Sequence, residues 1–285
     1  MKFALIDGEK REAERGINGV CLGCGQLMRP VCGAIRVRHW RHKVDCDCDH
    51  WWENETEWHR EWKGYFPSEW QEVRHKDYAT GEWHIADVKT DRGYVLEFQH
   101  SFLKSEERKA RNDFYGENLV WVVDGTKRKK DRSSFDAALK ETKQMIPNTS
   151  IVKLSAFVGD CPLLRDWSDC NVPVFFDFGS DVPLWCLMPK TAKKSQYIFP
   201  YLRQNFISLH NGLLNGKCFS DFNTLLFSKI FAHENPELVV AAKHSQIQSK
   251  QPPIVRRQIM VPRLSLRDLN YLVRPPRRQF KKYRK

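Results

Sequence analysis

The stretch that decides the expected fold runs from His84 to Ser101 and reads HIADVKTDRGYVLEFQHS. Two runs rich in β-branched, aromatic and aliphatic residues flank Thr90-Asp91-Arg92-Gly93, which has the composition of a tight turn. The stretch therefore predicts a β-hairpin.

Polar side chains fall on one side of this hairpin. Because successive side chains of a strand point to opposite faces, Asp87 and Lys89 share a face. Glu97 and Gln99 share a face of the returning strand in the same way. A solvated sheet face would produce the same alternation. The neighbouring segments are therefore needed to distinguish a functional site from an ordinary solvent-exposed face.

A helix is predicted on each side of the hairpin. Upstream, residues spaced by four form one stripe of a helix, namely Glu55, His59 and Lys63. Downstream, Ser101 is placed to cap a helix that runs to about Gly116 and contains Arg111. The segment NLVWVV, Asn118 to Val123, then reads as a buried strand.

Together these segments resemble the competence protein CoiA-like family. The resemblance covers about Val20 to Val123 and is carried by Glu55-Thr56, His59, Lys63, His84-Ile85-Ala86-Asp87, Leu96 to Ser101, Tyr115 and Trp121-Val122. That family carries a nuclease domain of the PD-(D/E)xK, restriction-endonuclease-like type. The resemblance implies an α/β (α+β) fold, with a mixed sheet flanked by helices behind an N-terminal zinc-ribbon-like module.

The resemblance also implies a metal site on the hairpin. Asp87 and Glu97 are expected to hold Mg²⁺ or Mn²⁺, with the backbone carbonyl of Phe98 as a third oxygen ligand. A hard cation held by carboxylates makes water nucleophilic and stabilises charge on the attacked phosphate. Glu55 is expected to complete or extend this set of ligands.

One position departs from the usual motif, which has lysine two residues after the second acid. Gln99 stands there, as it does in variants that include the CoiA-like family, and its amide can hydrogen-bond water or a phosphate oxygen. Lys89 or Lys63 is expected to supply the missing cation. His59, Lys63 and Arg111 are expected to contact phosphate.

The nine cysteines of the chain indicate a second metal site, because clustered cysteines in a reducing compartment usually bind metal. Cys21 and Cys24 form a C-x2-C pair, and His39 and His42 are expected to complete a structural zinc site. Cys32 and the segment from Cys46 to His50 offer competing ligands. A nucleobase deaminase is excluded, because the C-x2-C comes early and lacks the required proline.

The formal charge of +12 and the pI near 9.3 favour a polyanionic partner, most simply DNA. The expected backbone contacts are Lys127, Arg128, Lys129, Lys130, Arg277, Arg278, Lys281 and Lys282, although a solvated loop and a solubilising tail are the alternatives. The sequence has no apolar stretch of about eighteen residues and no signal peptide, which favours a cytoplasmic protein without a membrane partner.

The resemblance and the composition together divide the chain into four expected parts. They are a zinc-ribbon-like module (1–50), a nuclease domain (51–147), a β-rich accessory region (148–273) and a basic tail (274–285). The nuclease domain is expected to open with a strand at Trp70 to His75 and to close with a helix at Ser134 to Met145. Strands are expected in the accessory region at Ile151 to Val158, Val172 to Phe178 and Leu184 to Met188, with a helix near residues 221–232.

Two functions follow from these patterns. The first is a metal-dependent nuclease acting in DNA processing during competence, recombination or phage-related events. The second is a zinc-containing nucleic-acid-binding protein whose nuclease fold has weakened, as Gln99 suggests. The pair Asp87 and Glu97 favours the enzyme, because an acidic pair without a metal would repel the phosphate backbone. The sequence leaves open the strandedness of the DNA and the oligomeric state, for which a homodimer is one option.

Overall fold

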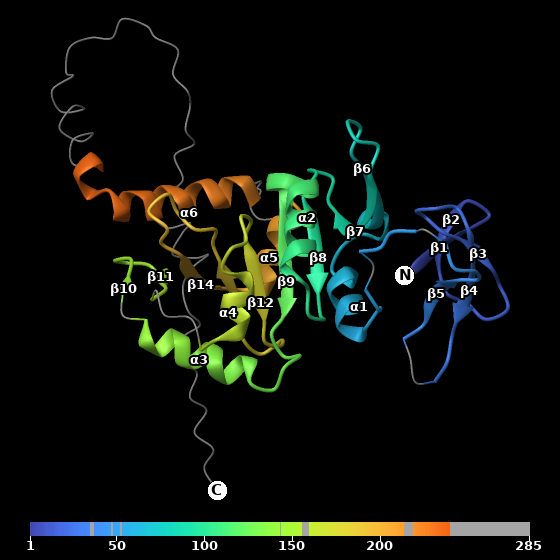
Figure 1. The fold of residues 1–285 in the computed structure, drawn as a ribbon, viewed down its shortest axis with the longest axis horizontal. Helices are drawn as coiled ribbons and strands as arrows, with labels where there is room; N and C mark the ends of the chain where they lie inside the picture. The colour runs from blue at the N-terminus through green and yellow to red at the C-terminus, as the bar shows by residue number, and fades with distance from the viewer. Residues whose placement is uncertain are drawn as a thin grey trace, which may run out of the picture.

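The computed structural model describes residues 1–34, 37–46, 48–51, 53–142, 144–155, 160–213 and 219–239. This part of the chain is a mixed α+β structure with two sheets (Figure 1). The basic tail, with Arg277, Arg278, Lys281 and Lys282, lies outside the described residues. None of the helices in the described ranges is both long enough and apolar enough to cross a membrane.

The N-terminal sheet has five antiparallel strands in the order β2-β1-β3-β4-β5. Their bounds are Phe3–Ile6 for β1, Glu9–Glu12 for β2, Gly19–Val20 for β3, Leu27–Val31 for β4 and His39–His42 for β5. The buried core of this sheet consists of Ala4, Ile6, Ala13, Cys21, Met28 and Trp40. A core of this size buries too little apolar surface to hold a sheet by itself.

The second sheet has nine strands in the order β10-β11-β14-β13-β12-β9-β8-β7-β6. The pairs β8–β9 and β9–β12 are parallel, and the other neighbours are antiparallel. Strands β6 to β9 are Gln71–Lys76, Trp83–Lys89, Val95–Gln99 and Leu119–Asp124. Strands β10 to β14 are Gln144–Met145, Val152–Lys153, Val174–Asp177, Leu184–Leu187 and Tyr197–Tyr201. Strands from the expected accessory region therefore continue the sheet of the hairpin.

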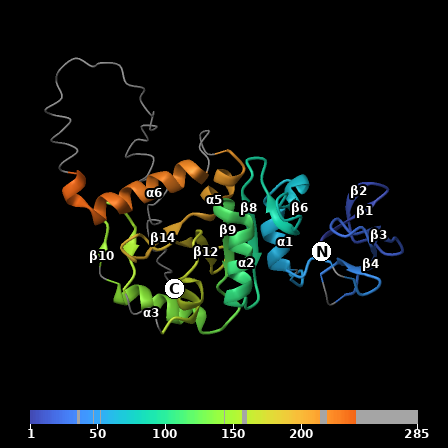
Figure 2. The same ribbon diagram turned by 45° about the horizontal axis from the view of Figure 1, so that its top comes forward.

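Helices cover both faces of the second sheet (Figures 1 and 2). In β9, Val120 and Val122 belong to one core cluster, and Trp121 and Val123 belong to the other. The first cluster includes side chains of α1, α5 and α6, and the second includes side chains of α2, α3 and α4. The helices are α1 Glu57–Gly64, α2 Ser105–Tyr115, α3 Asp131–Glu141, α4 Pro162–Trp167, α5 Arg203–His210 and α6 Phe219–Glu234, with 3₁₀ turns at Ser68–Trp70 and Gly116–Asn118.

The expected hairpin is confirmed, with β7 and β8 joined by a turn in which Gly93 has a φ of +84°. The expected cap of the next helix is wrong. Helix α2 begins at Ser105, and the N–H of Ser101 donates instead to Glu53 Oε1 at 2.5 Å. The helix expected to reach Met145 ends at Glu141, before the short strand β10.

Asp177, the last residue of β12, fixes helix α1 to the sheet. The indole N–H groups of Trp58 and Trp62 both donate to Asp177 Oδ2 at 2.9 Å, and Arg203 pairs with Oδ1. Trp62 and Asp177 are buried. A buried carboxylate that satisfies several donors holds its partners in one geometry. Helix α1 therefore presents its other face from a fixed position.

A buried histidine makes the described structure sensitive to acid. His210, the last residue of α5, contacts the rings of Phe206 and Phe219, and its Nε2 has no hydrogen-bond partner in the described structure. Burial lowers the pKa of His210 to about 4, from an ordinary 6.5. The imidazole of His210 therefore binds a proton more tightly in the unfolded chain than in the folded chain. We expect this residue to reduce the free energy of unfolding by about 3 kcal/mol as the pH falls from 6.5 through 4.

Urea unfolding at a series of pH values measures this effect. His210→Leu should lose less stability between pH 6.5 and 4 than the wild type, whereas His233→Leu, at an exposed position of α6, should follow the wild type. Parallel curves for the wild type and His210→Leu would show that the buried imidazole is not the cause.

Candidate functional site

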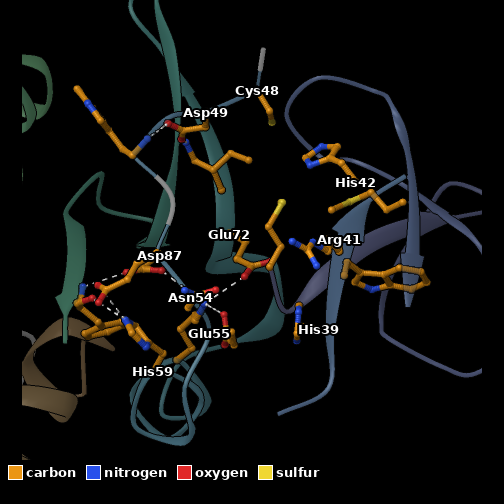
Figure 3. Close-up of a pocket in the computed structure, with 18 of the residues that line it drawn as sticks. His39, Arg41, His42, Cys48, Asp49, Asn54, Glu55, His59, Glu72 and Asp87 are labelled. Carbon is orange, nitrogen blue, oxygen red and sulfur yellow. Dashed lines mark hydrogen bonds and ion pairs between the residues drawn. The ribbon is translucent and has the colours of Figure 1, made fainter. Parts of the chain in front are cut away.

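A cavity of about 310 Å³ lies between the N-terminal sheet and the hairpin (Figure 3). Three parts of the chain form most of its walls, and helices α1 and α2 add His59, Lys63 and Arg111. Strand β5 contributes His39, Trp40, Arg41 and His42; the second sheet contributes Glu72, Asp87, Glu97 and Phe98; the connecting segment contributes Cys48, Asp49, Trp51, Glu53 and Glu55. The acidic pair of the hairpin thus faces the N-terminal sheet.

The acidic pair lies where β7 and β8 separate. The strands pair through Val88 with Leu96, and the ladder stops before it reaches Asp87 and Glu97. Asp87 Oδ2 accepts the N–H of Phe98 at 3.0 Å, and Glu97 Oε1 accepts the N–H of Asp87 at 3.4 Å. The two carboxylates therefore replace backbone carbonyls as acceptors, and the gap between the strands exposes them to the cavity.

Lys63, on α1, is buried among three acids. Its Nζ lies 2.8 Å from Glu55, 3.1 Å from Glu72 and 3.5 Å from Asp87. Burial alone would lower the pKa of Lys63, but the acids outweigh burial, Glu72 foremost, and raise it. Lys63 was expected to contact nucleic acid, and the structure places its ammonium group inside the acidic site.

Glu55 keeps its expected place beside Lys63 although it lies outside the helix. Helix α1 begins at Glu57, with Thr56 as the N-cap residue. Glu55 is nearly buried, and its Oε1 has no hydrogen-bond partner in the described structure. The site therefore contains one carboxylate oxygen that no protein donor satisfies.

Glu72, on β6, connects the two sheets and was missed by sequence analysis. Its carboxylate accepts the N–H groups of Lys2 at 2.6 Å and Phe3 at 2.8 Å. Its φ of +47° costs a non-glycine residue about 1–2 kcal/mol, which these contacts and Lys63 offset. Burial alone would raise the pKa of Glu72, but Lys63 and the two N–H donors help lower it to about 2.

Glu97 is buried and pairs with Arg111 of α2. Its Oε2 lies 3.1 Å from Arg111 Nη1, and Arg111 also contacts Glu107 and the carbonyl of Trp51. Burial and the nearby Asp87 raise the pKa of Glu97 to about 8, although Arg111 opposes the shift. Arg111 was expected to contact phosphate, but in the structure its guanidinium group forms an ion pair with Glu97.

His59 holds the carbonyl that was expected to be a metal ligand. Its Nε2 donates to the oxygen of Phe98 at 3.1 Å, and its Nδ1 lies 2.8 Å from Thr56 Oγ1. Burial alone would lower the pKa of His59, but Glu53 and Asp87 outweigh burial and raise it. His59 is only 3% exposed and lines the cavity.

The side-chain amide of Gln99 is hydrogen-bonded to Glu53, a residue that no sequence pattern singled out. The Gln99 amide donates to Glu53 Oε2 at 2.9 Å and to the carbonyl of Ser101 at 3.1 Å. Neither Gln99 nor Lys89 is among the residues that line the cavity. Of the two lysines expected to replace the motif lysine, Lys63 is therefore the one located in the site.

The basic run after β9 is exposed and also lies outside the cavity lining. Lys127 Nζ lies 2.9 Å from His100 Nε2, and Arg128 pairs with Asp131 at 2.8 Å and Asp166 at 3.1 Å. Lys129 and Lys130 complete the run. The structure thus places these four residues on the surface, where contact with nucleic acid stays a prediction.

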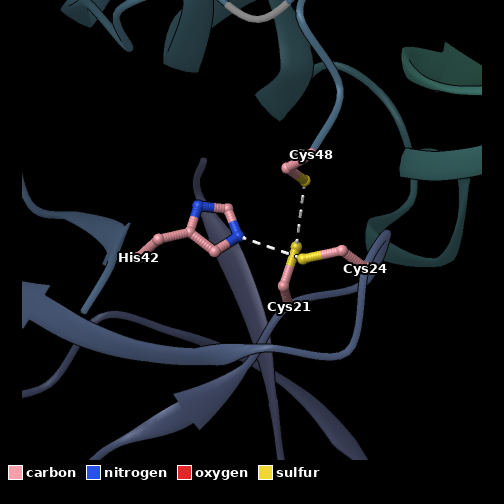
Figure 4. Close-up of side chains that lie close together, drawn as sticks. All are labelled: Cys21, Cys24, His42 and Cys48. Carbon is pink, nitrogen blue, oxygen red and sulfur yellow. Dashed lines mark hydrogen bonds between the residues drawn. The ribbon is translucent and has the colours of Figure 1, made fainter. Parts of the chain in front are cut away.

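A group of metal-type ligands lies at another side of the cavity and consists of Cys21, Cys24, His42 and Cys48 (Figure 4). The sulfurs of Cys21 and Cys48 are 3.7 Å apart, and Cys24 Sγ lies 3.3 Å from His42 Nε2. Two ligands of a tetrahedral zinc ion lie about 3.6–3.8 Å apart. These four residues could hold a metal ion such as zinc.

His39 does not belong to this group, which corrects the ligand set expected from the sequence. His39 and His42 are three residues apart on β5, so their side chains point to opposite faces of the strand. The Nδ1 of His39 lies 2.8 Å from the carbonyl of Val37, and Cys48 takes the fourth position. Cys32 also lies outside the group, with its thiol 3.5 Å from the carbonyl of Ala13.

No protein-family model, curated protein or solved structure matches this chain. A function must therefore follow from the residues of the cavity and of the thiol cluster.

The segment from Cys48 to Glu55 links the thiol cluster to the acidic site. Asp49 Oδ2 accepts the N–H of Ile85 at 2.6 Å, and its Oδ1 lies 2.8 Å from His84 Nδ1. Trp51 stacks on His84 with ring centroids 3.2 Å apart. Each of these contacts fastens the segment to β7, the strand that carries the first acid of the pair.

Proposed function

We propose that this protein is a metal-dependent nuclease with a PD-(D/E)xK, restriction-endonuclease-like site, and that its substrate is DNA. The observation that carries the proposal is the convergence of Asp87, Glu97 and Glu55 with the carbonyl of Phe98 in one cavity. The unsatisfied oxygen of Glu55 offers a further acceptor. Oxygen sets of this kind suit Mg²⁺ or Mn²⁺.

The protein residues have separate roles in this proposal. A bound divalent cation would polarise the phosphate and lower the pKa of a coordinated water. Asp87 and Glu97 would hold the cation, with Glu55 as a further ligand. Lys63 would supply positive charge beside the attacked phosphate, the role that the usual motif assigns to lysine at the position of Gln99. His59 would orient the Phe98 carbonyl, and Arg111 would orient Glu97.

We also propose that the thiol cluster holds a structural zinc ion. Three thiolates and one imidazole would fill a tetrahedral shell and leave no position for substrate. Through Cys48 and Asp49, such an ion would brace the connecting segment against β7. By the resemblance to the CoiA-like family, the nuclease would act in DNA processing during competence, recombination or phage-related events.

Cleavage assays test the proposed function. The protein would be incubated with supercoiled plasmid, single-stranded DNA and RNA in Mg²⁺, Mn²⁺, Ca²⁺ or EDTA. We expect cleavage of DNA in Mg²⁺ or Mn²⁺ and none in EDTA. If no nucleic acid is cut under any condition while DNA is still bound, the protein is the binding module with a weakened site.

A further inference from the structure

We propose that Arg41 and His39 of β5 bind the phosphates of an unpaired nucleic-acid strand in the cavity, so that the N-terminal sheet is the substrate-binding wall of the site. This inference rests on the proposed function, since it assumes that a phosphodiester reaches Asp87 and Glu97. The N-terminal sheet would then recognise the substrate in addition to carrying most of the thiol cluster.

The two faces of strand β5 carry side chains with different surroundings. Trp40 is 2% exposed and belongs to the small core, and His42 belongs to the thiol cluster. Because strand side chains alternate, His39 and Arg41 share the other face. In Figure 3 both lie on the side of the cavity opposite Asp87 and His59. The cavity therefore has an acidic wall and a wall that carries a guanidinium and an imidazole.

Elimination identifies Arg41 of these two residues. Among the other cationic side chains of the described lining, Lys63 is held by three acids, Arg111 by Glu97 and Glu107, and His59 by its contacts with Thr56, Phe98 and Glu53. Within the described residues, Arg41 has no acidic partner. An exposed guanidinium without a partner, facing a site that would otherwise repel phosphate, is suited to bind a phosphodiester backbone.

The dimensions of the cavity favour an unpaired strand. A sphere of 310 Å³ is about 8 Å across, at the small end of ligand-binding pockets. The major groove of B-DNA alone is about 12 Å wide, so a duplex cannot enter a space of this size. Glu97 at the inner end is only 4% exposed. A space of this size suits a single nucleotide, and the exposed side chain of Val44, which also lines the cavity, offers its base an apolar surface.

Fluorescence anisotropy with labelled oligonucleotides tests this inference. Binding would be measured in Ca²⁺ for a single strand and a duplex of equal length, at several salt concentrations. We expect the single strand to bind at least about tenfold more tightly. Arg41→Ala should weaken that binding by about tenfold and lower the magnitude of the salt slope by about 0.7, the value for one phosphate contact on a single strand.

The matched control is Arg11→Ala. Arg11 lies on β2, the opposite edge strand of the same sheet, and its exposed side chain pairs with Glu14. This variant should bind like the wild type, and Arg41→Lys should recover part of the loss. Tighter binding of the duplex, an unchanged affinity in Arg41→Ala, or an equal loss in Arg11→Ala would overturn the inference.

The outcome separates this inference from the proposed function. If the protein cuts DNA and Arg41→Ala changes neither binding nor KM, the nuclease stands and the role of Arg41 is wrong. If nothing is cut but Arg41→Ala weakens single-strand binding, the strand-binding wall is real and the nuclease proposal fails.

Discussion

Asp87→Asn is expected to abolish DNA cleavage without weakening the fold. Asparagine keeps an oxygen that can accept the N–H of Phe98, so the separated strands of the hairpin retain their bridge. It removes the negative charge that would hold a divalent cation. It also relieves the repulsion that, after burial, does most to raise the pKa of Glu97. We therefore expect cleavage to fall by about 1,000-fold or more, roughly 4 kcal/mol of transition-state stabilisation.

Thermal unfolding in the presence and absence of Mg²⁺ gives a readout that does not depend on cleavage. The wild type should gain stability with added Mg²⁺, because a ligand that binds only the folded state raises the free energy of unfolding. Asp87→Asn should lose that gain and keep an unchanged or higher Tm without metal. Glu97→Gln should lose both the gain and some stability, since Arg111 is left without its buried partner.

Asp91→Asn is the control, because Asp91 lies in the exposed turn of the same hairpin. It should cut DNA and respond to Mg²⁺ as the wild type does. If Asp87→Asn cuts DNA as well as the wild type, the acidic pair is not the catalytic site.

Loss of the proposed zinc ion from the thiol cluster is expected to unfold the N-terminal sheet. The core of this sheet has only six buried residues, so packing contributes little stability. Structural zinc binds with about 10–16 kcal/mol, and in small modules this free energy is folding free energy. Cys24→Ser should therefore abolish zinc binding and expose the first 46 residues to protease, while the second sheet retains its own unfolding transition.

Zinc content by mass spectrometry and limited proteolysis measure this outcome. The wild type should carry one zinc ion per chain and should lose protease resistance in the N-terminal sheet after chelation. Cys32→Ser is the control, because Cys32 lies in the same sheet region but outside the cluster. A Cys24→Ser protein with full zinc content and an intact N-terminal sheet would contradict the expectation.

The sequence predicted what depends on local spacing. Strand alternation and the turn between the two strands placed Asp87 and Glu97 on one hairpin, and the spacing of four placed His59 and Lys63 on one side of α1. Each pattern is a property of a single element, so it survives folding unchanged. Glu55 precedes the helix, so its contact with Lys63 does not follow from helical spacing. The same alternation, applied to β5, would have excluded one of His39 and His42 as a ligand, because residues three apart on a strand face opposite sides.

Contacts between distant segments could not be predicted in this way. Glu72 becomes part of the site only because it adopts a positive φ and bonds to Lys2 and Phe3 from the other sheet. Glu53 matters because it binds Gln99, which is 46 positions away in the chain. Nothing in the neighbourhood of either residue marks it, and each is one of many acids in a charged sequence. Pairing of β12 with β9 across the expected domain boundary is likewise a long-range property.

The connecting segment from Cys48 to Glu55 has a consequence for how this protein can be divided or changed. A fragment that ends at residue 47 would lack Cys48 of the thiol cluster, and a fragment that begins at residue 51 would lack the carboxylate of Asp49 that accepts the N–H of Ile85. The second of these fragments would fold with the backbone N–H of Ile85, on strand β7 of the hairpin, left without its acceptor. One inserted or deleted residue in the segment would put either Cys48 or Glu55 out of place. The N-terminal sheet is therefore not a detachable unit, and its exchange for a zinc-binding module would succeed only if this spacing were kept.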